Sequence, residues 1–501
     1  MLETKLTDIV TMQKEMTLIA SMTSLAHWDQ VVKMPKGAAG ARSEVLTYLA
    51  KLYHEKKTSK EYQVALEKWI DLKSGEIKDD SLSDHEIRLL KLSRKFYNEA
   101  FSLPVEFVEE YTNACTHGEH AWEEAKNAND FKMFAPFLDR IIQLTKKKAE
   151  YLNTGETLYD SLIHAFEPGM SCNKINPIFE QLRNGTIEIL NEVKKKNLTR
   201  PDFIFRHFPK VQQWEYQLGL IERMGMDPRH SRMDESEHPF STNFHPSDVR
   251  ITTHIKEDYF LDGLLSTMHE AGHALYELGM PMKWFGSTLC HAASFGIHES
   301  QSRFWENHIG RSDDFWQREF PLLKEKFKEQ LADVDYQTFM AGVNYVEPSL
   351  IRIEADELTY NLHIMIRYEL EEEIINGNIK IDELPERWNE KYQKYLGVSA
   401  DTEAKGVLQD VHWSGGAFGY FPSYSLGNLY AAQMHSYIVE NHNQLIKDVK
   451  SGNFLSTRQW LKDNVHQNGN SLSPEQLIEE VTGNALDASH FLNYARAKFL
   501  G

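Results

Sequence analysis

Apolar residues recur at three- and four-residue spacing along most of the first 230 residues, which places them on one face of an α-helix. The pattern is clearest over residues 6–26, 41–52, 85–101 and 134–152, and turns carrying Pro or Gly separate several of these segments. The same spacing returns after residue 280 and continues almost to the end of the chain. The sequence therefore predicts a mainly α-helical protein.

β-strand signals are rare in this chain. The exception is residues 248–255, Asp-Val-Arg-Ile-Thr-Thr-His-Ile, whose β-branched side chains predict a short strand and hence a very small β-sheet. A polar stretch over residues 224–240 precedes it and is expected to form a loop. Because the sequence contains no fixed-period repeat, low-complexity tract or linker, we predict a single domain over residues 1–501 with two lobes and the active site between them. Its parts are N-terminal helices (about 1–235), a central part (about 236–430) and C-terminal helices (about 431–501).

A helix is predicted directly after this strand. Asp258 or Asp262 can cap its start, and Gly279, followed by Pro281, is expected to end it. Its apolar positions are Leu264, Leu265, Met268, Ala271, Leu275 and Leu278.

The pentapeptide His269-Glu-Ala-Gly-His273 lies in the middle of this helix. Residues four apart lie on one helix face, so both imidazoles can hold one metal ion, with Glu270 beside it as general base for a metal-activated water. A catalytic zinc site has three protein ligands, and Glu299 is the candidate third ligand on a following helix. For each histidine taken alone, the alternative is a partly buried, hydrogen-bonded residue.

Arg352 is a candidate for binding a substrate carboxylate. A helix is predicted from Pro348 to about Ile375, and it places Asp356 one turn after Arg352 and Tyr360 on the same face. The pair is either a modest surface ion pair or an arginine held by its aspartate so that its planar guanidinium can bind a carboxylate through two hydrogen bonds.

A segment dense in glycines and aromatics over residues 406–427 predicts a structured loop that closely approaches another part of the molecule or a bound group. His412 and Tyr420, or else Tyr424, can donate hydrogen bonds to a developing oxyanion, which zinc peptidases require. Each aromatic taken singly is better explained by packing, and only the zinc motif in the same chain favours a role in the site.

Composition narrows the class of protein. The 501 residues include 55 Lys and Arg against 74 Asp and Glu, and the formal charge of −19 argues against nucleic-acid binding, which depends on a cationic surface. No stretch approaches the roughly 18 apolar residues of a membrane span, and the first residues lack the features of a signal peptide. Cys115, Cys172 and Cys290 are too few for a disulfide framework. A cytoplasmic enzyme without nucleic-acid or membrane partners is the simplest interpretation.

Six ordered segments make this sequence resemble the carboxypeptidase Taq family of zinc metallocarboxypeptidases. They are His238-Pro-Phe240, Asp248-x-Arg250-x-Thr252, His269-Glu-x-x-His273, His298-Glu-Ser, Ile351-Arg-x-x-Ala-Asp356 and Gly406-x-x-Gln-Asp-x-His-Trp413. The chain length, Trp28-Asp29 and Met34-Pro35 also suit this family. One position leaves a gap in the chemistry: one turn after Glu299, where a carboxylate would support a metal ligand, the residue is Arg303, and Glu306 is the nearest substitute.

The resemblance implies an almost entirely helical fold with a deep groove, similar to neurolysin-like peptidases. It implies release of single C-terminal amino acids from peptides with broad specificity, one Zn²⁺ per chain that Co²⁺ can replace, and a homodimer. His269, His273 and Glu299 would then bind the metal, and Glu270 would take a proton from water and pass it to the leaving amine. Arg352 would bind the terminal carboxylate. Arg250 is a weaker candidate for that role, because its pairing with Asp248 can be structural.

Two other functions are compatible with the zinc motif. An endo-acting oligopeptidase or a peptidyl-dipeptidase uses the same chemistry and differs in where the groove closes. A catalytically silent, zinc-stabilised binding protein belongs to another class, but a structural zinc needs four protein ligands and no base, so Glu270 argues against it.

Overall fold

Helices dominate the computed structural model, which describes residues 4–501, and they surround one three-stranded sheet. The mainly α fold with a very small sheet predicted from the sequence is therefore confirmed. Among the described residues, no helix is both long enough and apolar enough to cross a membrane.

The helices before the sheet include all four segments in which helical spacing was clearest. They are α1 (Thr7–Val32), α2 (Ala39–Lys57), α3 (Lys60–Glu67), α4 (Asp84–Ser102), α5 (Val105–Ala128), α6 (Phe131–Leu152), α7 (Leu158–Phe166), α8 (Cys172–Lys195) and α9 (Lys210–Met224). Those after the sheet are α10 (Phe260–Gly279), α11 (Phe295–Arg303), α12 (Asp313–Lys326), α13 (Tyr336–Val343), α14 (Tyr360–Ile375), α15 (Leu384–Tyr395), α16 (Pro422–Asn441), α17 (Asn443–Ser451), α18 (Phe454–Asn464), α19 (Pro474–Thr482) and α20 (Ser489–Phe499).

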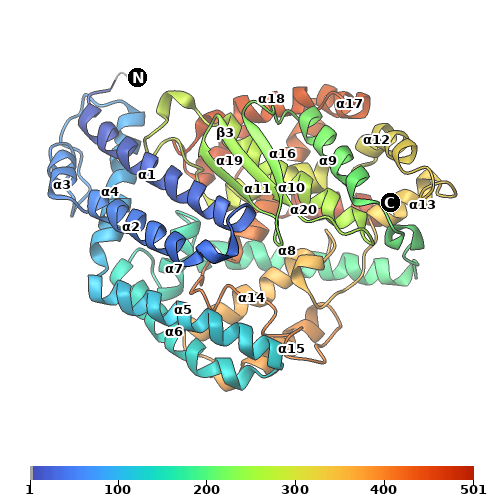
Figure 1. The fold of residues 1–501 in the computed structure, drawn as a ribbon, viewed down its shortest axis with the longest axis horizontal. Coiled ribbons are helices and arrows are strands. Elements are labelled where there is room, and N and C mark those ends of the chain that lie inside the picture. The colour runs from blue at the N-terminus through green and yellow to red at the C-terminus, as the bar shows by residue number, and fades with distance from the viewer. Residues whose placement is uncertain (1–3) are drawn as a thin grey trace.

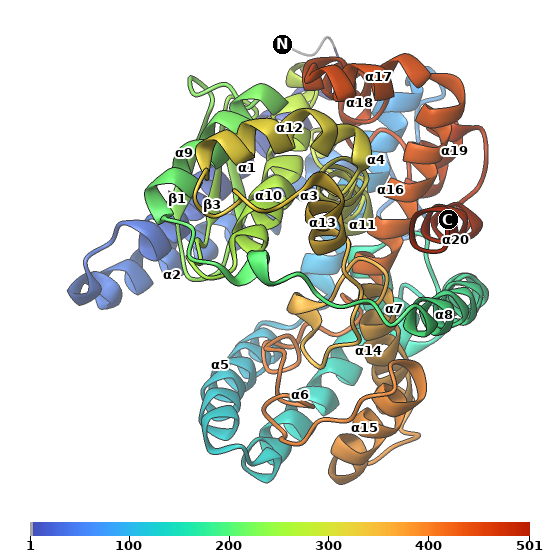
Figure 2. The same cartoon turned by 90° about the vertical axis from the view of Figure 1, so that its right-hand side faces the viewer.

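The molecule has two bodies of unequal size (Figures 1 and 2). The larger body contains the sheet, α10, α11 and α16, and the smaller one contains α5, α6 and α15, with α14 running between them. A single hydrophobic cluster extends from Ile141 of α6 through Tyr368 of α14 to Leu429 of α16, so the two bodies share one core. The assignment of residue ranges to parts of the domain stays a prediction.

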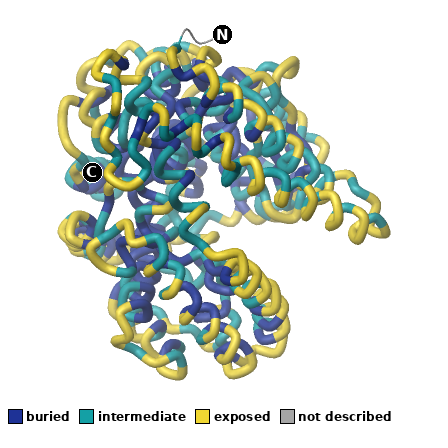
Figure 3. Tube along the Cα trace, turned by 90° about the vertical axis from the view of Figure 1, so that its left-hand side faces the viewer, coloured by how far each residue is buried: buried dark blue, intermediate teal, exposed yellow. Residues whose placement is uncertain are grey.

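The N-terminal helices α1, α3 and α4 have a second, smaller core. Leu6, Leu66 and Leu89 are buried there together with Trp284 and Leu289, which follow α10. Every residue of α2 is at least partly exposed, and α2 projects from the larger body (Figures 2 and 3). The chain that follows α10 therefore contributes to the attachment of α1, α3 and α4 to the larger body.

The sheet has the order β1–β3–β2, in which β1 (Ser231–Glu235) runs parallel to β3 (Asp248–Thr253) and β2 (Ser241–His245) runs antiparallel to it. The predicted strand is confirmed as β3. The predicted loop over residues 224–240 is wrong for β1, which is polar and has only Met233 and Asp234 buried. Pairing with β3 makes this segment a strand, and its own sequence lacks the alternation that would show it.

Two local predictions are corrected by the structure. The helix α10 begins at Phe260 without a side-chain cap, so neither Asp258 nor Asp262 caps it. The helix predicted from Pro348 begins only at Tyr360, after a 3₁₀ turn at Arg352–Glu354 and extended residues. Asp356 accepts hydrogen bonds from the N–H groups of residues 358 and 359 (2.9 and 3.0 Å), which fixes the chain before the helix.

Candidate functional site

His269 and His273 of α10 and Glu299 of α11 form a three-ligand cluster. The Nε2 atoms of His269 and His273 lie 3.6 and 3.3 Å from the same oxygen, Oε2 of Glu299. One ligand atom from each side chain lies within 4.8 Å of the others, close enough to share one ion. Two imidazoles and a carboxylate are a donor set that suits zinc and leaves a position for a reactant, so these residues fit a catalytic divalent metal.

The Nδ1 atoms of the two histidines point away from Glu299 and are held by different partners. Nδ1 of His269 lies 2.9 Å from Oε2 of Glu306. Nδ1 of His273 lies 3.1 Å from the main-chain oxygen of His298 and 2.6 Å from its Nδ1. Burial lowers the pKa of His273 to about 3, so its imidazole is neutral, as a metal ligand must be.

Glu306 is brought to the site by a π-helical turn, Phe304–Ile309, that continues directly from α11. Such turns occur frequently at functional sites. Arg303, at the position where the sequence left a gap, donates to Oε1 of Glu299 (2.7 Å) and to Oε2 of Glu306 (3.1 Å). Burial would raise the pKa of both carboxyl groups, but the Arg303 guanidinium and the neighbouring histidines together hold both pKa values well below their usual range. Arg303 therefore helps to keep Glu299 and Glu306 ionised.

Glu270 is buried between the two histidines along α10. Burial raises the pKa of its carboxyl group to about 7, although the neighbouring His269 acts to lower it. A carboxyl group that exchanges a proton near neutral pH is suited to general acid–base chemistry.

Two glycines allow α11 to lie very close to its neighbours. A β-carbon at Gly272, inside the pentapeptide of α10, would lie 2.5 Å from the main-chain oxygen of Gln301. A β-carbon at Gly427 of α16 would lie 2.5 Å from Cγ of Glu299. The helices α10 and α16 therefore approach the part of α11 that carries Glu299 from two sides, so closely that only glycine fits at these two positions.

Arg352 is buried, and its main partner is Asp410, not the predicted Asp356. Its Nε and Nη2 atoms lie 3.0 and 2.9 Å from Oδ1 of Asp410, and Nη1 donates to the Tyr360 hydroxyl (3.1 Å). The other oxygen of Asp410 accepts from Nε and Nη2 of Arg367, both at 2.6 Å. The predicted i, i+4 pair of Arg352 and Asp356 does not form, because residues 352–356 are not α-helical. The predicted neighbour Tyr360 does contact Arg352. Sequence reasoning missed Asp410 and Arg367, and the only signal was the position of Asp410 in the quoted Gln-Asp-x-His-Trp segment.

His412, Tyr420 and Tyr424 form one aromatic group beside Arg352. The rings of Tyr420 and Tyr424 are 5.1 Å apart, and Nε2 of His412 lies 3.4 Å from the Tyr424 hydroxyl. The Arg352 guanidinium lies 5.2 Å from the Tyr424 ring. Burial lowers the pKa of His412 to about 4, so it is a neutral hydrogen-bonding group. The structure therefore brings together the three residues that the sequence proposed for oxyanion binding.

Glu371 of α14 holds the loop that leads to Tyr420. Its carboxyl group accepts hydrogen bonds from Tyr159, from the Trp413 indole and from the Gly419 main chain, each at 2.8 Å. Both loop donors come from the segment between His412 and Tyr420. Sequence reasoning gave Glu371 no role, because its three partners are distant in the chain.

Arg250 has a closed set of contacts on the sheet. Its Nε and Nη2 atoms pair with Asp248, both at 3.1 Å, and its guanidinium lies 4.4 Å from the Trp28 ring and 4.7 Å from the Phe244 ring. These contacts anchor α1 to the sheet. They support the structural reading of the Asp248 pair that the sequence had left open.

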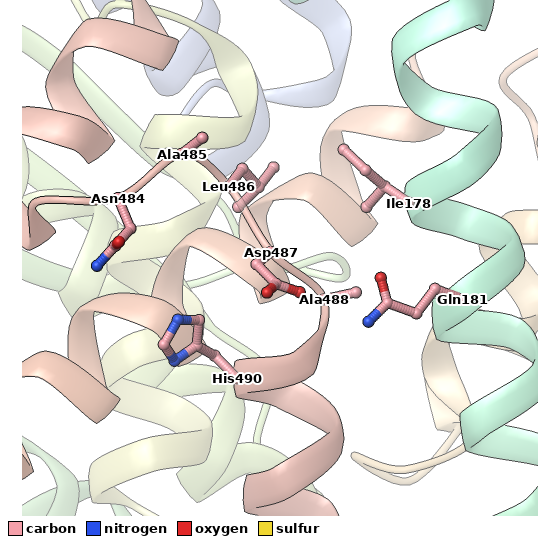
Figure 4. A pocket seen from close by; sticks show the side chains of 8 residues that line it. All are labelled: Ile178, Gln181, Asn484, Ala485, Leu486, Asp487, Ala488 and His490. Carbon is pink, nitrogen blue, oxygen red and sulfur yellow. The ribbon is translucent and has the colours of Figure 1, made fainter.

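A surface hollow lies apart from this site, between α8 and the segment that enters α20 (Figure 4). Gln181, Asp487 and His490 supply polar groups to its lining. His269, His273 and Glu299 are not part of that lining.

Three candidate metal ligands with a buried glutamate beside them, on a helical fold with a small sheet, are features of a metallopeptidase. The sequence profile of the carboxypeptidase Taq (M32) metallopeptidases matches residues 8–499. The chain thus belongs to the carboxypeptidase Taq (M32) family, as the resemblance of its motifs implied, and it is a peptide-bond hydrolase.

Relatives and solved structures agree with this assignment over nearly the whole chain. Thermostable carboxypeptidase 1 of Thermus thermophilus is 40% identical and carboxypeptidase 1 of Bacillus subtilis 36% identical, covering 98% and 97% of this chain and 98% and 96% of their own. The M32 carboxypeptidase of Deinococcus radiodurans superposes with a TM-score of 0.94 at 36% identity, covering 98% of each chain. The carboxypeptidase of Pyrococcus furiosus superposes with a TM-score of 0.95 at 32% identity, covering 100% of this chain and 99% of its own.

Proposed function

We propose that this metallocarboxypeptidase removes single amino acids from the C-termini of peptides with broad side-chain specificity, using Zn²⁺ held by His269, His273 and Glu299. The observation that carries the proposal is the convergence of both Nε2 atoms on one oxygen of Glu299, with Glu270 buried beside them. When bound, a divalent metal supplies a Lewis acid that polarises the peptide carbonyl and makes water more acidic.

Glu270 acts as the base that takes a proton from the attacking water. Its raised pKa lets it hold that proton and deliver it to the leaving amine, so that one carboxyl group serves both halves of the reaction. Tyr420, or else Tyr424, and neutral His412 donate hydrogen bonds to the oxyanion that forms at the carbonyl. Burial raises the pKa of Tyr420 to about 12, which keeps its hydroxyl protonated and able to donate.

Arg352 binds the free carboxylate of the substrate. Three of its five N–H groups face Asp410 and Tyr360, which fixes the guanidinium and leaves two donors for a ligand. Arg250 is the weaker candidate, because its guanidinium already contacts Asp248 and two aromatic rings.

Further properties in the proposal rest on family resemblance and composition. These are replacement of zinc by cobalt, assembly as a homodimer, and peptides as the partners. A cytoplasmic location is consistent with three free cysteines among the described residues, since disulfides form in oxidising compartments.

The experiment that tests the activity compares one peptide with a free and an amidated C-terminus, with products identified by mass spectrometry. Amidation removes the carboxylate charge that Arg352 would bind, and truncating one partner of a buried, hydrogen-bonded charge pair costs about 2–5 kcal/mol, so kcat/KM should fall roughly 30- to several-thousand-fold. Arg352→Ala should reproduce the loss on the free peptide and add little on the amidated one, because both changes delete one interaction.

An endo-acting oligopeptidase or peptidyl-dipeptidase on the same scaffold makes the opposite prediction. Internal cleavage of the amidated peptide at an undiminished rate, or release of dipeptides, would replace the proposed specificity. If amidation reduces the rate and Arg352→Ala does not, the carboxylate site lies elsewhere and Arg250 is the next residue to change.

A further inference from the structure

His273, His298 and Glu277 form a hydrogen-bonded chain that the proposed reaction does not use. Nδ1 of His273 lies 2.6 Å from Nδ1 of His298, and Nε2 of His298 lies 2.9 Å from Oε1 of Glu277. The Glu277 carboxylate accepts a further hydrogen bond from the Asn243 side chain of β2. The side chains of His298 and Glu277 are 26% and 14% exposed, so the chain is largely shielded from water.

The main-chain oxygen of His298 fixes the tautomer of His273, because a carbonyl oxygen can only accept and Nδ1 of His273 must therefore be the donor. The lone pair of His273 is thereby left on Nε2, the atom that faces Glu299. Nδ1 of His298 faces the same Nδ1 of His273, and the carboxyl group of Glu277 faces Nε2 of His298.

The two metal-binding histidines are therefore supported unequally. Glu306 accepts directly from His269, whereas the carboxylate that serves His273 is one imidazole further away. His269, His273 and Glu277 are spaced at i, i+4 and i+8 along α10, so they share one face of the helix. His298 lies next to Glu299 on α11, so the same helix supplies the third ligand and the intermediary.

We propose that Glu277, acting through His298, is a positioning residue that orients the His273 ring and raises its metal affinity. The inference rests on the proposed metal site. Carboxylates that orient a metal-binding histidine raise its basicity, and their loss typically lowers metal affinity about 10- to 100-fold. Glu277 produces this effect through the His298 ring, which lies between its carboxyl group and His273.

The test is the zinc dissociation constant of metal-free protein, measured by competition with a chromophoric chelator. Glu277→Gln keeps the side-chain shape and removes the charge, and we expect it to weaken zinc binding 10- to 100-fold. Asn243→Ala is the matched control, since it removes the other partner of Glu277 and leaves the His298 bond in place, and it should change the constant less than threefold. The thermal midpoint of each metal-free variant separates loss of metal affinity from loss of fold.

Double variants distinguish a relay from general damage. If Glu277 acts only through His298, Glu277→Gln combined with His298→Gln should bind zinc no more weakly than His298→Gln alone. Glu277→Gln combined with Glu306→Gln should instead multiply the two losses, because these residues serve different histidines.

Three results would overturn the relay: a Glu277→Gln constant within twofold of the wild type, a loss equal to that of Asn243→Ala, or multiplying losses for Glu277 and His298. If Glu277→Gln does not fold, His298→Gln decides, and unchanged affinity there refutes the proposal. A wild-type protein that binds no zinc would instead refute the proposed function, which keeps the two failures distinct.

Discussion

Replacing Asp410 by asparagine tests the buried ion cluster that holds Arg352. The Asp410 side chain is 13% exposed, and its two oxygens face two guanidiniums at 2.6–3.0 Å. The asparagine amide would be neutral and would turn an N–H group toward one of the arginines. Removing one partner of a buried pair costs about 3–5 kcal/mol, and we expect the upper part of that range because two cations would remain.

The measurement is urea unfolding of the zinc-loaded protein at neutral pH, followed by circular dichroism. Asp227→Asn is the matched control. Asp227 also pairs with an arginine, Arg229, which lowers the pKa of the Asp227 carboxyl group, but these side chains are far more accessible, at 34% and 81% exposed. This control should leave the urea midpoint nearly unchanged, since exposed pairs contribute little. Equal shifts for the two variants, or a loss below about 1 kcal/mol for Asp410→Asn, would refute the reasoning from burial.

The pH dependence of the same variant has a definite sign. Arg367 and Arg352 outweigh the effect of burial and hold the pKa of Asp410 well below its usual range. A lowered folded-state pKa stabilises the protein above the unfolded-state value of about 4, and this stability is lost as the pH falls further. Asp410→Asn should therefore flatten the acid side of the stability curve, and an unchanged acid slope would contradict the assigned ion cluster.

Three further predictions concern the reaction itself. Glu270→Gln should lower kcat at least about 10²-fold while zinc content, measured by plasma mass spectrometry, stays near one per chain; activity within a few-fold of wild type would remove Glu270 as the base. Tyr420→Phe should lower kcat roughly 10²- to 10³-fold in steady-state assays, with Tyr424→Phe as the control; a loss only at Tyr424 would exchange the two roles, and none at either would refute both. Chelation should abolish peptide hydrolysis, and zinc or cobalt should restore it, whereas full activity after verified metal removal would exclude the mechanism.

The sequence revealed the helices and the metal motif because each depends on residues close together in the chain. The spacing of apolar residues predicted α1, α2, α4 and α6, and the same reasoning placed His269 and His273 on one face of α10. Glu299 was found in the same way as the candidate third ligand, since a zincin needs a donor from a later helix, and the structure places its carboxylate beside both imidazoles.

The failures have a common cause, which is that long-range partners override local pattern. The helix expected from Pro348 begins only at Tyr360. Arg352 pairs with Asp410, 58 residues away, and Asp356 accepts a hydrogen bond from the main chain that precedes the helix. In the same way β1 exists only through its pairing with β3. Glu371 contacts the site through partners on other elements, so no spacing in the sequence could indicate it. Glu277 shares a helix face with His269 and His273, but that spacing could not indicate its contact with His298 of α11.

The glycine inside the pentapeptide has a consequence for what the motif can tolerate. Metal chemistry asks for specific side chains only at its first, second and fifth positions, which makes the two spacers look interchangeable. In this fold the fourth position is the point where α10 touches the backbone of α11, and Gly427 makes the corresponding approach from α16. A single methyl group at Gly272 or Gly427 would push α11, which carries Glu299, away from the histidines. The three candidate ligand residues themselves would be unchanged. We therefore expect a substitution at Gly272 or Gly427 to inactivate the protein although the His-Glu-x-x-His motif stays complete. The absence of a side chain at these two positions sets how closely Glu299 can approach the histidines.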